Sequence, residues 1–439
     1  MANIPQDKRI LSIQSHVVAG YVGNKAASFP LQLLGWEVDA ALTVSFSNHT
    51  GPRYGRWGGS KFDAAHLEDV FSALDANGLL RQSHLLTGYV PGADALKVVV
   101  RAVDRLRAVN PKLVYVLDPV MGDDGRIYVS ESVIPIYKAL LPRATCATPN
   151  YFEAELLTDV KILDAASLKA ALRMFHERYR LPNIVISAVS LGTAELEKLG
   201  FTDVRDASGS TPRRMLVCSG STIVSAPGEL IKSVAFGVAF PELAEHYEGV
   251  GDVFSSLVAG RFPCHSDPAF SAHPVSPLAH TVELAIGSLQ GILARTRQHA
   301  LALANNRPEA IVPREGESAD ERVRRLRTVE LRLIQSQQEI LDPEIRYRAK
   351  QYLLPYLPFL SQFRLFAFSA FSLSASFNGR SPVDSVSRRS DYSNGLSRAR
   401  SFTVSVFTSP PVPRMESWII MMIYISMLRR STITVRCRR

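Results

Sequence analysis

Short apolar runs alternate with helix-length segments over the first 260 residues of the chain. Five runs have the length of a strand, at residues 10–13, 38–44, 113–117, 144–147 and 184–186. Between them, apolar residues at helical spacing occupy residues 64–80, 95–109 and 165–179. This alternation predicts an α/β fold in which helices cover both faces of a mostly parallel sheet. Such folds bind ligands beyond the carboxyl ends of the strands, so the polar residues that follow each strand are the candidate site.

The remaining chain divides into further helices and a tail of different composition. Helical spacing predicts helices at residues 249–260, 282–303 and 330–340, and residues 306–321, rich in Pro, Glu, Gly and Arg, predict an exposed connection. From residue 354 to the end the chain has 17 serines, 12 arginines, no lysine and no apolar period. We therefore expect one domain over residues 1–353 and a disordered basic tail over residues 354–439.

One apolar run, WIIMMIYISML at residues 418–428, interrupts the tail. It is shorter than the roughly 20 residues that span a bilayer, so no transmembrane helix is predicted. Flanked by Arg429 and Arg430, the run fits a segment on a membrane surface as well as unstructured or aggregation-prone sequence. The abrupt change in composition also suggests translated intron or an altered reading frame, which an intact mass including all 439 residues would exclude.

The formal net charge of +9 comes entirely from this tail. Before residue 354 the chain has 38 basic and 38 acidic residues, so no nucleic-acid partner is expected for the main domain. The four cysteines are far apart and form no C-x-x-C pair, which argues against a zinc site and a disulfide framework. Because MANIPQDKRILSIQ is no secretory signal, the expected location is the cytoplasm, with the nucleus also open.

EGVGDVFSS, residues 248–256, places two glycines and an aspartate directly before an apolar helical stripe. Gly249 and Gly251 permit left-handed backbone angles and let a ligand approach the main chain, and Asp252 is expected at the helix start. The unpaired N–H groups and the positive dipole of a helix start together bind phosphate. Considered alone, the stretch favours a structural interpretation, an ordinary turn with Asp252 as the helix N-cap.

Oxygen-bearing side chains follow the strands at residues 113–117 and 144–147. Asp118 and Asp123 in DPVMGDDG can hold a cation or its water shell, although Asp, Pro and Gly are also the usual residues of a turn. In ATPNYFEAELL, Thr148 and Asn150 follow the strand, and Glu153 comes three residues after Asn150. This spacing predicts a capping box, and it also points Glu153 toward the crevice at the strand ends.

Hydroxyls and an aromatic ring follow the other strands. Ser15 is expected to end the first strand, Ser187 to end IVIS, and LLTGY brings Tyr89 to a position where it can face a planar ligand. SFSNHTG offers His49 and Thr50 after the second strand, although an isolated histidine is more often a structural hydrogen-bonding group. GNKAA lacks the Walker lysine pattern, so a P-loop is excluded as the phosphate binder.

Taken together, these segments resemble the pyridoxal kinase branch of the ribokinase-like superfamily. SIQSHVVAGYVGN, FSNHTG, LTGY, VYVLDPVMGD, TPNYFEAELL and GVGDVFSS occur in the family's order and near its spacing, and LRLIQSQQEILDPEI resembles its C-terminal end. A GxGD motif alone is shared by many sugar and vitamin kinases, whereas SHVVAGYVGN and FSNHTG are specific to this branch. The resemblance covers residues 9–353. It implies a ribokinase-like three-layer α/β/α sandwich and a kinase that uses ATP to phosphorylate the 5′-hydroxymethyl group of pyridoxal, pyridoxine and pyridoxamine.

The resemblance also implies roles for the residues that match the family's motifs. Asp252 is the catalytic base, and the backbone amides of Gly249, Val250, Gly251 and Asp252 hold the transferring γ-phosphoryl group. The implied substrate contacts are Ser15, Thr50 and Tyr89, with Val44 and Phe46 lining the pocket of the ring. The implied nucleotide contacts are Asp123, Asn150, Ser187, Val250 and Gly251. Asp118, Thr148 and Glu153 fall where the family places its cations, Mg²⁺ (or Zn²⁺) and K⁺. The family also implies a homodimer.

Several features depart from the family pattern. Pro52 and Arg53 are extra residues in the NHTGPRYGRWGG loop, which helps to close over the substrate. Ala188 stands where members often have a hydroxyl, so one hydrogen bond to the nucleotide is expected to be missing. Val250 stands where threonine is common, with little effect expected because the backbone amide remains. The tail has no counterpart in the family.

Two other functions stay open at this point. One is a ribokinase-like kinase for another hydroxymethyl compound, such as a hydroxymethylpyrimidine. The other is a catalytically idle scaffold whose basic tail binds membrane or nucleic acid, which predicts salt-sensitive binding that is lost on truncation after Leu353. Every expected polar residue except the one at Ala188 is present, which argues against idleness.

Overall fold

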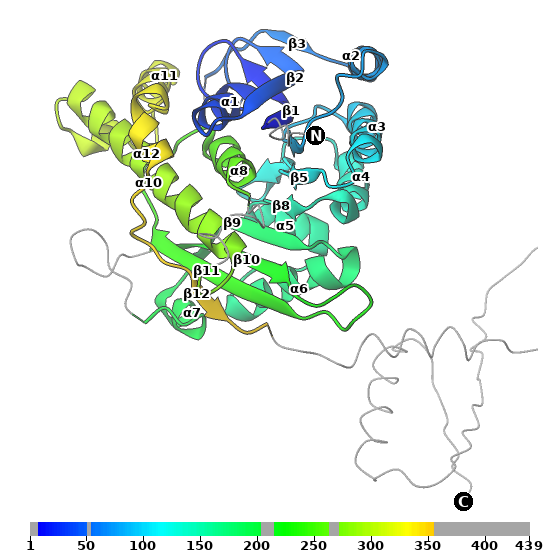
Figure 1. Ribbon diagram of the computed structural model, residues 1–439. Helices are drawn as coiled ribbons and strands as arrows, with labels where there is room; N and C mark the ends of the chain where they lie inside the picture. Colours follow the sequence, from blue (N-terminus) through cyan, green and yellow to red (C-terminus); the bar gives the residue numbers. More distant parts are fainter. Residues whose placement is uncertain (1–7, 51–53, 203–214, 263–271, 355–439) are drawn as a thin grey trace, which may run out of the picture. The chain divides into compact units, whose positions relative to one another are not determined.

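A ten-stranded mixed sheet forms the centre of the protein (Figure 1). The computed structural model describes residues 8–50, 54–202, 215–262 and 272–354. In these ranges the strands lie in the order β12-β11-β10-β9-β8-β5-β4-β1-β2-β3. The parallel strands are β1 (Arg9–Val17), β2 (Glu37–Phe46), β4 (His84–Thr87), β5 (Val114–Leu117), β8 (Cys146–Ala147) and β9 (Asn183–Leu191). They include each of the five predicted strands, and they confirm the predicted parallel core of the sheet.

Antiparallel strands extend this parallel core at both edges. They are β3 (Gly59–Lys61) beside β2 and, at the other edge, β10 (Met215–Ile223), β11 (Ser233–Pro241) and β12 (Lys350–Tyr352). A separate two-stranded ribbon, β6 (Gly122–Asp123) with β7 (Arg126–Ile127), follows β5. The sequence pattern predicted none of the antiparallel strands.

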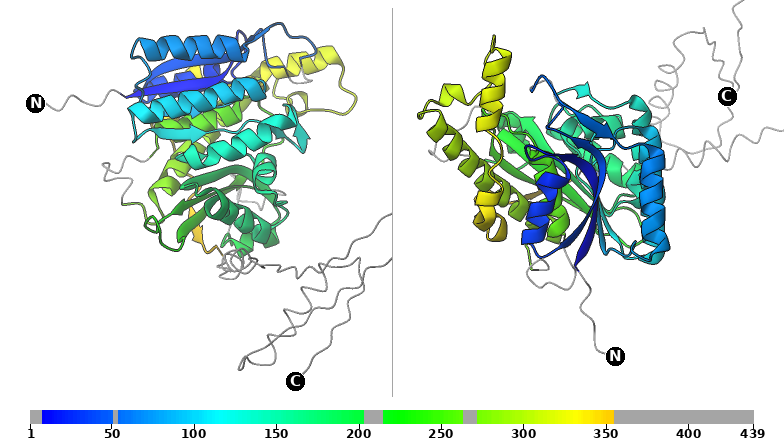
Figure 2. Two further views of the ribbon diagram at one scale, coloured as in Figure 1. Left: turned by 90° about the vertical axis from the view of Figure 1, so that its right-hand side faces the viewer. Right: turned by 90° about the horizontal axis from the view of Figure 1, so that it is seen from above.

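Helices cover both faces of the sheet (Figure 2), which confirms the predicted three-layer sandwich. One face carries α2 (Ala64–Ala76), α3 (Ala93–Val109), α4 (Ile134–Leu140), α5 (Tyr151–Thr158), α6 (Ala165–Tyr179) and α7 (Thr193–Lys198). The other carries α1 (Asn24–Leu33), α8 (Val250–Gly260), α10 (Pro277–Leu303) and α12 (Gln337–Leu341). In β5 the side chains alternate between the two cores, with Tyr115 and Leu117 in the first and Val116 in the second. Both faces of the sheet are therefore buried under helices, as a parallel sheet requires.

The C-terminal part of the domain is less regular than its apolar spacing suggests. Helix α10 begins at Pro277, where the Ser276 hydroxyl accepts a hydrogen bond from Ala279 N–H at 3.1 Å. The expected helix over residues 330–340 is wrong, because α11 (Ala319–Thr328) ends before it and only η4 (Ile334–Ser336) and α12 lie inside it. The expected connection at residues 306–321 contains η3 (Pro308–Ala310) and the first turn of α11. The remaining 3₁₀ turns are η1 (Glu131–Val133) and η2 (Leu141–Arg143).

Some sequence predictions fall on other parts of the chain. Pro52, Arg53 and, from residue 355 onward, the predicted tail with its apolar run at 418–428 lie outside the described residues. Among the described residues, no helix is both long enough and apolar enough to cross a bilayer.

Candidate active site

The first turn of α8 brings the two glycines and the aspartate of GVGD together. Gly249 is the N-cap, with φ of 77°, and a Cβ there would lie 1.9 Å from the carbonyl oxygen of Tyr21. This residue must therefore be glycine, both for its backbone angle and for its contact with the loop after β1. Asp252 lies at the third helical position, so the interpretation of Asp252 as the N-cap is wrong. Its carboxylate makes no capping hydrogen bond and lies beside the unpaired N–H groups of the helix start.

The Asp252 carboxylate accepts a hydrogen bond from the backbone N–H of Gly23. Burial raises its pKa to about 6, the Gly23 bond opposes this, and the negative charge of Glu248 adds to the rise. Gly23 packs so closely on β1 that a Cβ there would lie 2.1 Å from the Ser15 carbonyl oxygen. A carboxyl group with a pKa near neutrality is suited to accept a proton from a hydroxyl.

A buried acidic cluster adjoins Asp252 at the carboxyl ends of β5 and β8. Asp118 follows β5, and burial followed by the charges of Glu153 and Asp252 raises its pKa well above the usual range. The Ser255 hydroxyl of α8 faces this carboxylate and opposes the rise in its pKa. Burial likewise raises the pKa of Glu153 to about 8, although backbone N–H groups of Met121, Asn150 and Gly122 donate to it. Such a cluster lowers its own electrostatic energy by binding a cation.

Thr148 adds an oxygen ligand to this cluster. It lies directly after β8, is 4 % exposed, and its hydroxyl has no hydrogen-bond partner among the described residues. An orphaned buried hydroxyl costs roughly 1–3 kcal/mol, which a bound cation relieves. Together with Asp118 and Glu153 it supplies only hard oxygen donors, the set that K⁺ and Mg²⁺ prefer over zinc-type nitrogen and sulfur sites. The residues present therefore fit the cations that the family resemblance implies.

Three of the residues expected at the nucleotide lie next to one another through backbone contacts, namely Asp123, Asn150 and Ser187. Asn150 caps α5 in the predicted capping box with Glu153, and its side-chain amide donates to the Gly122 carbonyl at 2.8 Å, beside Asp123. Ser187 N–H donates to the carbonyl of Pro149, which precedes Asn150, at 3.0 Å. Asp123 is exposed on β6. The capping box satisfies much of Asn150, and the Asp123 carboxylate accepts a hydrogen bond from Asp124 N–H at 2.9 Å.

Ser15 and Ser187 lie at irregular pairings inside strands, and the expectation that they end their strands is wrong. β1 continues to Val17, and its pairing with β2 shifts between Gln14 and Ser15. β9 continues to Leu191 and shifts against β10 at Ser187 and Ala188. Such bulges re-aim side chains and occur often beside active sites. The strands therefore bend at these serines.

The residues expected around the substrate ring form a small apolar cluster of their own. Val44 and Phe46 of β2 are buried with Val17 and Val22, and Tyr89 packs against them from the loop after β4. Val22 immediately precedes Gly23, whose N–H binds Asp252, so the loop after β1 joins this cluster to the start of α8. Thr50 is exposed and borders residues 51–53, which lie outside the described part.

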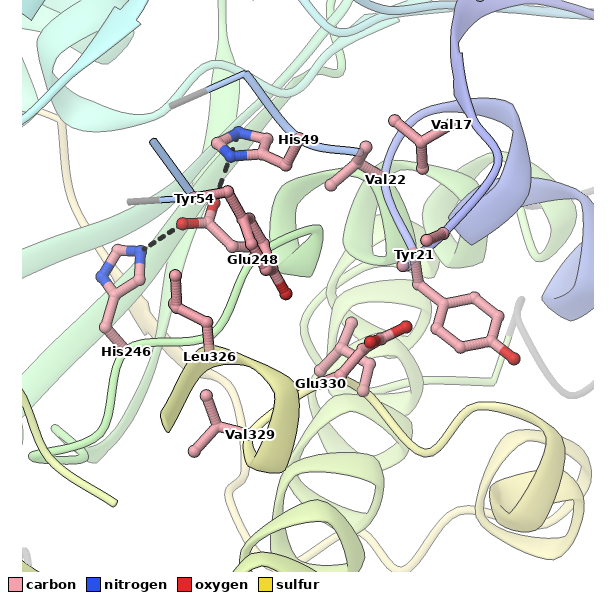
Figure 3. A pocket seen from close by; sticks show the side chains of 13 residues that line it. Val17, Tyr21, Val22, His49, Tyr54, His246, Glu248, Leu326, Val329 and Glu330 are labelled. Atoms are coloured by element: carbon pink, nitrogen blue, oxygen red, sulfur yellow. Dashed lines mark ion pairs between the residues drawn. The ribbon is translucent and has the colours of Figure 1, made fainter. Parts of the chain in front are cut away.

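A pocket opens between this loop and the residues that lead into α8 (Figure 3). His49 and His246 lie on either side of Glu248, with Nε2 to carboxylate distances of 3.5 and 3.6 Å. Tyr54 and Glu330 line the same pocket. Glu248, Ser255 and Gly23 were not among the site residues predicted from the sequence. Ser255 lies in the segment GVGDVFSS, and Gly23 lies in the segment YVGNKAA. Only the helical register of α8 shows which of its hydroxyls faces Asp118.

A second cluster of possible metal ligands lies at the other end of α8. His273, His280 and Glu283 converge there, and Thr281 donates to the carbonyl of Arg261 at the α8 C-cap. Nδ1 of His273 accepts hydrogen bonds from backbone N–H groups, so Nε2 carries the proton and faces Glu283 at 3.4 Å. The Glu283 carboxylate also accepts from Arg348 and from Ala349 N–H. These contacts engage both oxygens of the Glu283 carboxylate in structural bonds.

Comparisons with known proteins agree with this geometry. A family model described as phosphomethylpyrimidine kinase matches residues 77–211. The pyridoxal kinase of Arabidopsis thaliana is 33 % identical over 354 residues, which cover 80 % of this chain and 96 % of that protein. Human pyridoxal kinase is 34 % identical over 349 residues, covering 78 % and 98 %. The structure of Leishmania donovani pyridoxal kinase in complex with ADP and pyridoxamine superposes with a TM-score of 0.62 at 32 % identity, covering 79 % of this chain and all of that one. The chain belongs to the pyridoxal kinase family.

Proposed function

We propose that the protein transfers the γ-phosphoryl group of ATP to the 5′-hydroxymethyl group of pyridoxal, pyridoxine and pyridoxamine. The observation that carries this proposal is the junction at Val22 and Gly23. It joins the apolar cluster of Val17, Val22, Val44, Phe46 and Tyr89 to a carboxyl group with a pKa of about 6 at a helix start. The relatives that the chain resembles over most of its length are pyridoxal kinases, and a related structure contains ADP with pyridoxamine.

In the proposed mechanism Asp252 takes the proton of the hydroxymethyl group as its oxygen attacks the γ-phosphorus. The bond to the β-phosphate oxygen breaks, and ADP leaves with that electron pair. The N–H groups at the start of α8, from Gly249 to Asp252, stabilise the charge on the transferring group. Phosphoryl transfer depends chiefly on such positioning and charge stabilisation. A carboxylate beside a helix start provides both.

The same proposal assigns the remaining residues. Val44, Phe46 and Tyr89 hold the ring, with Ser15 and Thr50 as polar contacts. The nucleotide is held by Asp123, Asn150, Ser187, Val250 and Gly251. Asp118, Thr148 and Glu153 would hold K⁺ and Mg²⁺ (or Zn²⁺), which when bound neutralise phosphate charge. We further propose a homodimer in the cytoplasm, with the catalytic domain ending near residue 353.

A vitamer assay tests the function directly. Purified full-length protein should convert each B6 vitamer to its 5′-phosphate with ATP and Mg²⁺, as followed by chromatography of the products. The same assay on residues 1–353 tests the proposed domain division and should give similar rates. No turnover of any vitamer by the full-length protein would contradict the proposal.

A second candidate function is a kinase for a hydroxymethylpyrimidine, because the matching family model is described as phosphomethylpyrimidine kinase. Both substrates present a hydroxymethyl group on a flat nitrogen heterocycle, which the same apolar cluster and base can serve. Including the pyrimidine in the vitamer assay separates the two. Turnover of the pyrimidine without turnover of any vitamer would favour this candidate.

Replacing Thr148 with valine tests the cation assignment. Valine has nearly the shape of threonine and removes the orphaned hydroxyl, so the metal-free variant should melt at or slightly above the wild-type temperature. A cation that binds only the folded protein raises its melting temperature. We therefore expect added KCl, compared with the choline salt, to stabilise wild type more than Thr148→Val. Equal stabilisation of both proteins by KCl would refute the assignment.

A further inference from the structure

Glu248 lies between two segments of the site that are far apart in the sequence. One carboxylate oxygen faces Nε2 of His49, in the segment after β2, at 3.5 Å, and the other faces Nε2 of His246 at 3.6 Å (Figure 3). Glu248 immediately precedes Gly249, the N-cap of α8, and its side chain is 25 % exposed. His49 is adjacent to Thr50. The carboxylate thus joins the end of β2 to the start of the catalytic helix.

We propose, on the basis of the proposed function, that Glu248 is a positioning residue of the kinase. Its carboxylate holds the His49–Thr50 segment over the substrate and lies just before α8, four residues before Asp252. The mechanism described above makes no use of this residue. Its ion pairs are partly exposed, so they are expected to contribute little to overall stability. Their effect should therefore be found in kinetics.

The groups around Glu248 and Asp252 determine the effect of removing the negative charge of Glu248. Glu248 interacts with His49, His246 and Tyr54, and Glu330 lines the same pocket, while the charge of Arg327 acts on Tyr54. Asp252 faces Glu248, Asp118 after β5, Tyr128 after β7, and the N–H of Gly23. The negative charge of Glu248 raises the pKa of Asp252. Removing that charge lowers this pKa, so the base stays deprotonated at lower pH.

Kinetics of Glu248→Gln test this inference. Glutamine keeps the shape of the side chain and loses its charge. We expect KM for pyridoxal at pH 8 to rise about fivefold with kcat within about twofold. The melting temperature should stay within about 2 °C of the wild type.

Two further variants test the positioning. His49→Gln removes the partner and retains the carboxylate, so it should raise KM similarly. Glu242→Gln makes the same chemical change earlier in the connection between β11 and α8, and it should match the wild type in both readouts.

The outcomes distinguish the inference from the function on which it rests. An unchanged KM in Glu248→Gln would overturn the role of Glu248 while leaving the kinase assignment intact. Absence of vitamer turnover by the wild type would overturn both.

Discussion

Asp252→Asn should lower kcat for pyridoxal phosphorylation by about a thousandfold, because a positioned general base contributes roughly 10²–10⁴-fold and asparagine accepts no proton. The amide keeps the size of the side chain, and Asp252 makes no capping bond that the change could break. Single-turnover measurements with saturating ATP and pyridoxal give the rate of the chemical step. A variant that retains near-wild-type turnover would refute the role of Asp252 as the base.

Stability provides the control for this variant. The pKa of Asp252 is about 6 in the folded protein, above the ordinary value of 3.8, so its ionisation disfavours the folded state as pH rises between these values. Asparagine removes that cost. Asp252→Asn should therefore be more stable than wild type at pH 8, on the order of 2 kcal/mol, and equal to it below pH 4. Chemical denaturation at both pH values measures this difference. A loss of stability at pH 8 would indicate a structural role.

The sequence predicted the parallel core and the helix starts because local signals determine them. Residues 165–179 formed the predicted helix residue for residue, and Asn150 with Glu153 formed the predicted capping box. Both depend on side chains within four positions of each other, which a single sequence displays directly. Asp118 and Thr148 also follow their strands as expected. Because these two strands are parallel, both residues lie at the same edge of the sheet.

Other features depend on contacts between distant segments, and the sequence did not reveal them. The bulges at Ser15 and Ser187 arise from pairing with β2 and β10, so the strands continue past residues that looked terminal. No helix lies between the antiparallel strands β10 and β11, so the alternating pattern did not include them. Gly23 reaches Asp252 only because α1 packs beside α8. Glu248 contacts His49, which lies about 200 residues earlier in the sequence. Pairing of this kind has no local signal.

The two glycines of GVGD should respond in opposite ways to alanine. In Gly249→Ala the new Cβ meets the Tyr21 carbonyl oxygen at 1.9 Å on a backbone with φ of 77°, so the start of α8 must move. We expect a loss of roughly 3 kcal/mol in the free energy of unfolding, together with loss of activity. At Gly251 a Cβ meets nothing within 4 Å, and alanine favours the helix. Gly251→Ala should therefore keep or raise the melting temperature. Its methyl group lies where the phosphates approach, so KM for ATP should rise about tenfold. Equal stability of both variants would show that the contact with Tyr21 is dispensable, and an unchanged KM for ATP in Gly251→Ala would place the phosphates elsewhere.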